Sequence, residues 1–253
     1  MTTYAPPFTD IAHLTGALRT AGYALLSAHD VFTLAGCEPA ELDALAASWD
    51  ALPPDAFLKD GGRYRRRRHS CFIDDGAQLT QTAHRAHWQS SEYNALHGGM
   101  HRLFEPSEAA TLAHSAWTRL VRALSEVCWR VKGPQPWYVE NTAPWFVEAH
   151  QFRIDTLEGI GRPTPEGAHR DGVDFVAVLL VARSNVKGGE TRVFEADGPD
   201  GKRFTMLEPW TLLLIDDAKV IHESTPIQPA GENGHRDTLV LTWRASSFQG
   251  EDA

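Results

Sequence analysis

The sequence contains few cysteines and no recognisable export signal. Only Cys37, Cys71 and Cys128 are present in 253 residues, and no two of them form a CxxC pair. An odd number of widely spaced cysteines argues against a disulfide framework and indicates a reducing compartment, so we expect a cytoplasmic protein. The first residues, MTTYAPPFTD, include neither the basic nor the apolar segment of a secretory signal.

Long apolar runs and an excess of basic charge are also absent. No stretch approaches ~18 uninterrupted apolar residues, so we expect no membrane span. The formal net charge is −9, whereas a nucleic-acid partner usually requires a basic balance. The hydrophobic fraction of 42% and charged fraction of 23% are ordinary for a globular enzyme. Without repeats, low-complexity tracts or a long linker, residues 1–253 are predicted to form a single domain.

The first half of the chain, residues 1–140, is predicted to supply mostly helical support together with segments that cap a substrate site. Apolar residues at helical spacing and suitable capping residues indicate three helices. They run from Asp10 to Gly22, from Pro39 to Trp49, and from Ser107 to Gly133. A short strand is predicted from Tyr23 to Ser27, and the basic segment GGRYRRRRHSCF at 61–72 is predicted to be extended.

The second half of the chain, residues 141–246, has the pattern of a β core. Short apolar runs alternate there with turn residues, as expected of strands. The predicted strands are Phe146 to Ile154, Val173 to Val181, Glu190 to Phe194, Thr211 to Ile215 and Thr238 to Trp243. Several such strands without intervening helices favour a mainly β sandwich or barrel with helical support.

His169-Arg170-Asp171 is a candidate metal-binding motif. We expect it to open the strand at 173–181, where residues i and i+2 project from the same face. His222 lies 53 residues later, after the strand-like run TLLLIDDAKVI. Two imidazoles and one carboxylate form the facial triad of non-heme iron(II) oxygenases, which leaves positions open for a 2-oxo acid and O2. His169, Asp171 and His222 are therefore the predicted metal ligands and catalytic residues.

The same tripeptide recurs as His235-Arg236-Asp237, and its position suggests another role. No histidine follows His235, so this copy cannot recruit a later ligand. Arg236 lies 14 residues beyond His222, and we expect it beside the strand that leads into His222. A guanidinium can bind the distal carboxylate of 2-oxoglutarate with a two-pronged hydrogen bond. A kinase catalytic loop also reads His-Arg-Asp, but the glycine-rich loop and Asp-Phe-Gly are absent.

Substrate contacts are predicted from several polar side chains. Alternation places Arg65 and Arg67 on one face of an extended segment, where Arg67 above all could bind a substrate carboxylate. The alternative is a solvated basic stripe or an RNA-binding patch formed by residues 65–68. Arg153 either binds substrate or braces a structural acid, because a buried arginine needs a partner. Further candidates are Tyr93 and Asn94 for the substrate, and Thr238 and Thr191 for the co-substrate.

Three stretches of the sequence carry a family resemblance. PEGAHRDGVDFVAVLLVARSNVKGGET, LEPWTLLLIDDAKVIHESTPI and GHRDTLVLTW resemble the bacterial 2-oxoglutarate/Fe(II) dioxygenases that include L-isoleucine 4-hydroxylase and related free-amino-acid hydroxylases. YRRRRHSCF and HQFRI are also similar, so the resemblance covers roughly residues 60–245. It implies a double-stranded β-helix (a jelly roll, cupin-like) flanked by helices. The residues that match the family's pattern are His169, Asp171 and His222 for Fe(II) and Arg236 for 2-oxoglutarate.

The resemblance also implies a reaction. The enzyme would use Fe(II), 2-oxoglutarate and O2, with ascorbate as an in vitro reductant, to hydroxylate an unactivated C–H bond of a free L-amino acid or a similar metabolite. Hydroxylation of a carrier-bound or peptide-bound residue stays open as an alternative. A cupin-type hydrolase or isomerase with zinc or manganese is a further one, but it leaves Arg236 without a purpose. The expected partner is a small-molecule amino acid, and the sequence predicts no oligomeric state.

Overall fold

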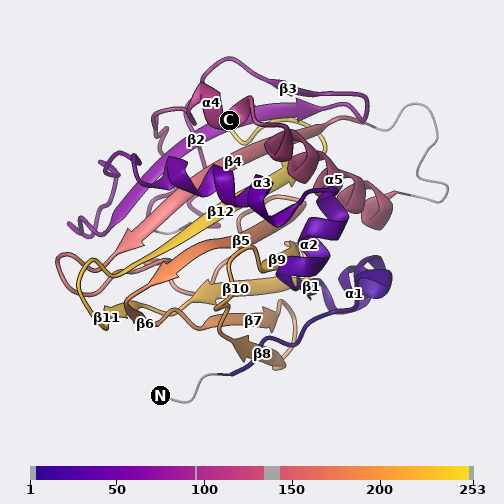
Figure 1. The fold of residues 1–253 in the computed structure, drawn as a ribbon. Coiled ribbons are helices and arrows are strands. Elements are labelled where there is room, and N and C mark those ends of the chain that lie inside the picture. The colour runs from indigo at the N-terminus through magenta and orange to yellow at the C-terminus, as the bar shows by residue number, and fades with distance from the viewer. Residues whose placement is uncertain (1–3, 95, 134–142, 251–253) are drawn as a thin grey trace.

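An antiparallel sheet forms the centre of the fold (Figure 1). The protein is described from a computed structural model, over residues 4–94, 96–133 and 143–250. In spatial order this major sheet consists of β1 (Tyr23–Leu26), β9 (Leu212–Asp216), β5 (Phe175–Ser184), β12 (His235–Arg244), β4 (Trp145–Asp155), β2 (Arg65–Asp74) and β3 (Leu79–Gln81). Neighbouring strands are all antiparallel. Because β1, β2 and β3 precede residue 140 and the other four strands follow it, the sheet combines strands from both halves of the sequence.

Shorter strands form a second layer against one face of the major sheet. They are β10 (Val220–Ser224), β7 (Thr191–Glu195) and β8 (Gly201–Phe204), with β11 (Ile227–Pro229) paired to β6 (Val186–Gly188). Apolar side chains of both layers pack together, among them Val176 and Leu213 from the major sheet and Val193 and Val220 from the second layer. Two facing antiparallel layers are the architecture of a jelly roll, which confirms the expected fold class.

Helices cover the outer face of the major sheet (Figure 1). They are η1 (Ile11–His13), α1 (Leu14–Ala21), α2 (Ala28–Ala35), α3 (Pro39–Ala46), η2 (Ala47–Trp49), α4 (Ala109–Leu112) and α5 (Ser115–Lys132). The stripe Leu120, Val121, Leu124, Val127 and Cys128 of α5 has the spacing of a helix with one buried face, and all of it is buried. None of the described helices is long and apolar enough to cross a membrane.

Two of the helix predictions were incomplete. Helix α2 was not predicted, although Ser27 and Asp30 form a capping box at its start. The helix expected from Ser107 is divided into α4 and α5, because His114 leaves the helical conformation and accepts a hydrogen bond from the Ala116 N–H. The β core also extends beyond the predicted residues 141–246, since β1, β2 and β3 belong to the major sheet.

The arginine-rich segment is extended, as predicted. Strand β2 pairs with β4, with Arg67 opposite Phe152 and His69 opposite His150. Arg65 and Arg67 are buried on the inner face, whereas Arg66 and Arg68 are more exposed. The neighbouring strands β2 and β4 therefore carry polar side chains into the space between the two layers.

Candidate metal centre and substrate pocket

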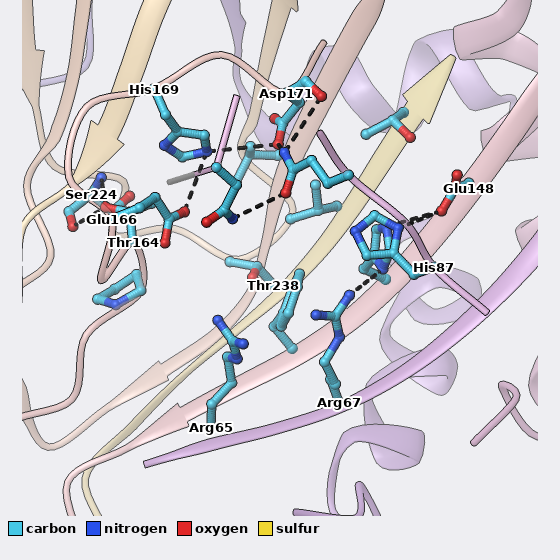
Figure 2. A pocket seen from close by; sticks show the side chains of 18 of the residues that line it. Arg65, Arg67, His87, Glu148, Thr164, Glu166, His169, Asp171, Ser224 and Thr238 are labelled. Carbon is cyan, nitrogen blue, oxygen red and sulfur yellow. Dashed lines mark hydrogen bonds and ion pairs between the residues drawn. The ribbon is translucent and has the colours of Figure 1, made fainter. Parts of the chain in front are cut away.

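A pocket lies on the inner face of the major sheet (Figure 2). His169, Asp171 and His222 line one side of it. Arg67, His87 and Glu148 lie together on another side, as Figure 2 shows for these labelled side chains. Polar groups from strands of both layers, from loops and from the segment after β12 thus converge on one cavity, which is the usual form of a small-molecule site.

His169, Asp171 and His222 are close enough to share a ligand. His169 Nε2 lies 3.6 Å from Asp171 Oδ1, and His222 Nε2 lies 3.7 Å from Asp171 Oδ2. The two imidazole centroids are 4.7 Å apart. The three donor atoms lie within 4.8 Å of one another, so they could surround one metal ion. Two nitrogens and a carboxylate oxygen match the facial triad that sequence reasoning predicted.

The reason for this convergence differs from the prediction. His169 and Asp171 lie in the loop before β5, which begins at Phe175, and not on the strand itself. His169 instead forms an isolated antiparallel bridge with His222 of β10, with N–H to O distances of 3.1 and 3.0 Å. Backbone pairing across the two segments therefore brings both imidazoles together, rather than alternation along one strand.

Neighbouring groups orient the side chains of this cluster. His169 Nδ1 donates a hydrogen bond to the Gly167 carbonyl oxygen at 2.9 Å, so Nε2, which faces Asp171, is the ring atom that could bind a metal. The Gln89 side-chain amide donates to Asp171 Oδ1 at 3.1 Å. Such outer hydrogen bonds fix the direction of metal ligands in known sites. Glu166 Oε1 also lies 3.5 Å from His169 Nε2, on the pocket wall.

The backbone around Asp171 is held by a buried carboxylate. Asp217 accepts hydrogen bonds from the N–H groups of residues 171, 172 and 173 at 3.0, 2.8 and 3.2 Å. Gly172 has a φ of 75°, and a Cβ there would lie 2.4 Å from the ring of Tyr93. Tyr93 therefore packs against this loop, and it is not among the described residues that line the pocket. Its predicted contact with substrate is not supported.

The titration behaviour of the cluster reflects its charges. Burial opposes protonation of His169, but the hydrogen bond and charge of Asp171 outweigh burial and raise the pKa of His169 to about 10. Burial and the nearby His169 lower the pKa of His222 to about 4. The two imidazoles hold the pKa of Asp171 below its usual range in spite of its burial. Without metal, the cluster is thus one ionised carboxylate next to one protonated and one neutral imidazole.

Arg236 is a buried cation that lines the same pocket. Only 3% of it is exposed, and its Nε and Nη2 atoms have no hydrogen-bond partner among the described residues. Burial, and then the charge of Arg183, lowers the pKa of Arg236 to about 10. Its position was predicted incorrectly, because β5 separates β12 from β9, and His222 lies on β10 in the second layer. Arg236 nevertheless reaches the cavity from β12, as Thr238 does.

Three more arginines, Arg65, Arg67 and Arg102, line the pocket. Arg65 Nε forms an ion pair with Asp55 at 2.7 Å. The Arg67 guanidinium stacks between two rings, with its Cζ 3.7 Å from the Phe104 centroid and 4.5 Å from the Phe152 centroid. Because Arg65 and Arg67 are 6% and 3% exposed, these two side chains belong to the pocket and not to an exposed basic stripe.

Two other predicted contacts lie elsewhere. Arg153 on β4 forms an ion pair at 2.7 Å with Asp237, its register partner on β12, and a second ion pair at 2.9 Å with Asp50. It therefore braces structural acids and is not among the described residues that line the pocket. Thr191, on β7, is likewise not among the described residues that line the pocket. Asn94 lines the pocket and donates a hydrogen bond to Gln89 at 3.0 Å.

A second cluster of histidines was missed in the sequence. His69, His87, Glu148 and His150 also place one donor atom each within 4.8 Å of the others. His69 follows Arg67 by two residues on β2, and Glu148 precedes His150 by two on β4, so strand alternation was the available signal. We call these four residues the histidine cage. Three of them, His87, Glu148 and His150, line the pocket.

Comparison with known proteins identifies the family. A family model for 2OG-Fe dioxygenases matches residues 46–242, and the chain belongs to this family. The crystal structure of a bsmA homolog from Methylobium petroleophilum PM1 is 48% identical in sequence, covers 99% of each chain, and superimposes with a TM-score of 0.89. No curated protein matches the sequence.

More distant solved structures share the fold. IDO from Bacillus thuringiensis is 19% identical, with a TM-score of 0.75 over 94% of this chain and 100% of that one. The Fe(II)/(alpha)ketoglutarate-dependent dioxygenase TqaL is also 19% identical, with a TM-score of 0.68 over 94% and 90%. The protein is accordingly a dioxygenase that uses Fe(II), 2-oxoglutarate and O2. The resemblance found in the sequence is confirmed for the family, while the amino-acid hydroxylase subgroup stays a prediction.

Proposed function

We propose that His169, Asp171 and His222 hold the Fe(II) of this enzyme, that Arg236 binds the distal carboxylate of 2-oxoglutarate, and that the substrate is a free L-amino acid or a similar metabolite. One observation carries the proposal. A two-histidine, one-carboxylate cluster and a buried guanidinium with unpartnered N–H groups line the same pocket.

The donor groups fit an iron(II) ion. His169 presents Nε2 to the cluster, because its Nδ1 is bonded to the Gly167 carbonyl. In the metal-free protein the carboxylate of Asp171 stabilises a proton on His169 Nε2. A metal ion bound at Nε2 would displace this proton, as metals do when they bind imidazoles. When bound, Fe(II) with 2-oxoglutarate and O2 supplies the oxidant for C–H hydroxylation, with succinate and CO2 as co-products. The protein's part is to orient the groups and exclude water.

The surroundings of Arg236 fit a carboxylate. A buried guanidinium without a partner carries a large desolvation penalty, which an anionic ligand relieves. Its planar fork can donate two parallel hydrogen bonds to one carboxylate. Thr238, two residues further along β12, lines the pocket and can add a hydroxyl hydrogen bond. Thr191 is not among the described residues that line the pocket, so we do not assign it this role.

The remaining cations favour an anionic group on the substrate. Arg67 lines the pocket on the side of the histidine cage and is held there by aromatic rings on both faces. We assign it to the substrate carboxylate, with Arg65 beside it and Asn94 on the wall. A carrier-bound residue has no free carboxylate, so this assignment favours a free amino acid over a tethered one.

A substrate screen tests the proposed function. The twenty amino acids, citrulline, ornithine and pipecolate are each incubated with enzyme, Fe(II), ascorbate and 2-oxoglutarate, and products are followed by mass spectrometry and succinate release. A free amino acid that gains one oxygen atom is the expected result. Oxidation of only carrier-bound or peptide substrates would contradict the free-amino-acid assignment, and turnover that continues without 2-oxoglutarate would contradict the role of Arg236.

A further inference from the structure

The histidine cage surrounds a single carboxylate oxygen. His69 Nε2 and His87 Nδ1 lie 2.7 and 2.8 Å from Glu148 Oε2, and His150 Nε2 lies 3.8 Å from it. The rings of His69 and His150 stack with centroids 4.6 Å apart. The four side chains come from β2, β4 and the loop at residue 87, and three of them line the pocket.

Hydrogen bonds fix the state of each group in the cage. Nη2 of Arg67 lies 2.7 Å from His150 Nδ1, and because a guanidinium only donates, His150 must accept there and carry its proton on Nε2. His69 and His87 donate to Glu148. Burial keeps all three imidazoles neutral by lowering their pKa values, that of His87 to about 4. The imidazoles hold the pKa of Glu148 below its usual range, so the cage has one net negative charge.

The carboxylate of Glu148 and the guanidinium groups of Arg67 and Arg102 can each accept or donate further hydrogen bonds to a ligand. Every hydrogen bond that the described residues give to Glu148 goes to Oε2, while Glu148 lines the pocket and Oε1 receives none. Arg102 lines the pocket, is 2% exposed, and forms no ion pair with a described residue. Arg67 is 3.9 Å from Asp55, whose closer partner is Arg65 at 2.7 Å. His150 therefore has the Glu148 carboxylate on its Nε2 side and the Arg67 guanidinium on its Nδ1 side. Arg102 approaches the same Phe104 ring as Arg67, with its Cζ 6.0 Å from the ring centroid.

A second metal ion is the competing interpretation of the cage, and its surroundings oppose it. Distances of 2.7 and 2.8 Å to one oxygen are ordinary hydrogen bonds between N–H and carboxylate. In the other cluster the nitrogen-to-oxygen distances are 3.6 and 3.7 Å, which leaves room for an ion. The Arg67 guanidinium also touches His150, and a dication beside it would be repelled.

We propose that Glu148 binds the ammonium group, and that Arg67 with Arg102 binds the carboxylate, of a free α-amino acid. The inference rests on the proposed function and names the groups that recognise its substrate. An α-amino acid carries its ammonium and its carboxylate on the same carbon, and Glu148 and Arg67 offer the complementary charges at the two nitrogens of one ring, His150. His69, His87 and His150 are positioning residues, since they fix the Glu148 carboxylate and hold Arg67 without adding charge. Such a receptor rejects acylated amines and amidated carboxylates, because each leaves a buried charge unpaired.

Binding without turnover tests this recognition. Enzyme loaded with Fe(II) and 2-oxoglutarate under nitrogen is titrated by calorimetry with the twenty free L-amino acids, and then with the N-acetyl and carboxamide derivatives of the tightest binder. We expect each derivative to bind at least about thirtyfold more weakly. In Glu148→Gln the preference for the free amine over the N-acetyl form should disappear, and in Arg67→Lys the preference for the carboxylate over the carboxamide should shrink.

Arg66→Lys is the matched control, because Arg66 lies next to Arg67 on the outer face of β2, 36% exposed. It should keep both preferences. If the wild type binds the free amino acid and its N-acetyl and carboxamide derivatives equally well, the proposed recognition is wrong, whatever the variants show. A second bound metal ion that Glu148→Gln removes would also contradict it. The visible absorption of the iron–2-oxoglutarate complex separates the two levels of failure. If that absorption does not form, the proposed function fails; if it forms but the preferences are absent, only this inference fails.

Discussion

The pocket contains two clusters of histidines around a carboxylate, and they differ in how their donor atoms are used. In the cluster of His169, Asp171 and His222, nitrogen and oxygen atoms stand 3.6 to 3.7 Å apart. In the histidine cage, two of the imidazoles already give their N–H groups to Glu148 at 2.7 and 2.8 Å. The first arrangement leaves its nitrogen and oxygen atoms around a shared centre with room for an ion, whereas in the second these atoms already form hydrogen bonds with one another.

The charges next to the two clusters differ in the same sense. Asp171 is accompanied by a second acid, Glu166, on the wall beside His169. The cage instead touches the guanidinium of Arg67. A second carboxylate beside the first cluster favours a bound dication, whereas a guanidinium in contact with the cage opposes one. Residue types alone therefore do not define a metal site; the spacing of the atoms and the neighbouring charges distinguish the two.

Removal of one histidine from each cluster should separate them most sharply. His222→Ala removes one of three proposed iron ligands, so we expect turnover to fall at least about a hundredfold and bound iron to be lost. His69→Gln should retain one equivalent of iron, because the cage takes no part in holding it. Metal content measured by mass spectrometry checks both variants. Iron retained by His222→Ala and lost from His69→Gln would reverse the comparison.

Arg236 should matter for the co-substrate and for nothing else in the pocket. Arg236→Ala removes the proposed partner of the distal carboxylate, so we expect the KM for 2-oxoglutarate to rise at least about thirtyfold. Steady-state kinetics at saturating substrate measure this KM. The KM of Arg236→Lys should lie between those of the wild type and Arg236→Ala, because lysine keeps the positive charge but cannot form the two-pronged hydrogen bond. An unchanged KM in Arg236→Ala would remove this residue from the role.

The hydrogen bond from Gln89 offers a finer test of the first cluster. Gln89→Ala leaves the three proposed ligands intact but frees Asp171 Oδ1 to rotate. Loss of such an outer contact commonly weakens metal affinity about tenfold to a hundredfold, and we expect an effect in that range. The exposed Gln81→Ala on β3 is the control and should bind iron as the wild type does. Equal affinity in both variants would show that Asp171 is oriented without Gln89.

The smallest expected effect is a difference in pH dependence between the clusters of the metal-free protein. The pKa of His87 is lowered to about 4 in the folded protein. Between about pH 6.5 and 4 the unfolded chain therefore binds more protons than the folded protein does, and the stability that neutral His87 contributes falls as the pH drops through this range. The pKa of His169 is raised to about 10, so its contribution is full below about 6.5 and is lost as pH rises towards 10.

Thermal unfolding of the metal-free wild type and His87→Gln measures the acid limb. The dependence of Tm on pH between 4 and 6.5 should be shallower in His87→Gln, because one titrating group is gone. Identical slopes would mean that His87 is protonated in the folded protein and does not serve as a neutral donor to Glu148. Metal binding should flatten the alkaline limb, since it replaces the proton on His169.

The sequence predicted those parts of the site that depend only on neighbouring residues along the chain. His169, Asp171 and Arg236 stand close to runs whose apolar pattern marks strands, so their arrival at the sheet was foreseeable. The β character of residues 146–243 and the extended arginine segment were foreseeable for the same reason. Strand alternation correctly separated Arg67 from Arg66.

Features that depend on strand register were not predictable from the sequence. Arg153 meets Asp237 only because β4 and β12 pair in one register, and His69 meets Glu148 and His150 only because β2 joins the same sheet. His87 arrives from a loop with no pattern at all. The Asp171 loop was mistaken for the start of a strand because it directly precedes the apolar run that begins at Val173. The positive φ of Gly172 was not evident beforehand.

The location of iron is the most direct test of the central claim. Crystals grown without oxygen from protein loaded with Fe(II) and 2-oxoglutarate, measured at the iron absorption edge, would show every bound iron as an anomalous peak. We predict one peak, between His169, Asp171 and His222, with 2-oxoglutarate extending from it to Arg236. A peak inside the histidine cage, or none among the three proposed ligands, would contradict this account.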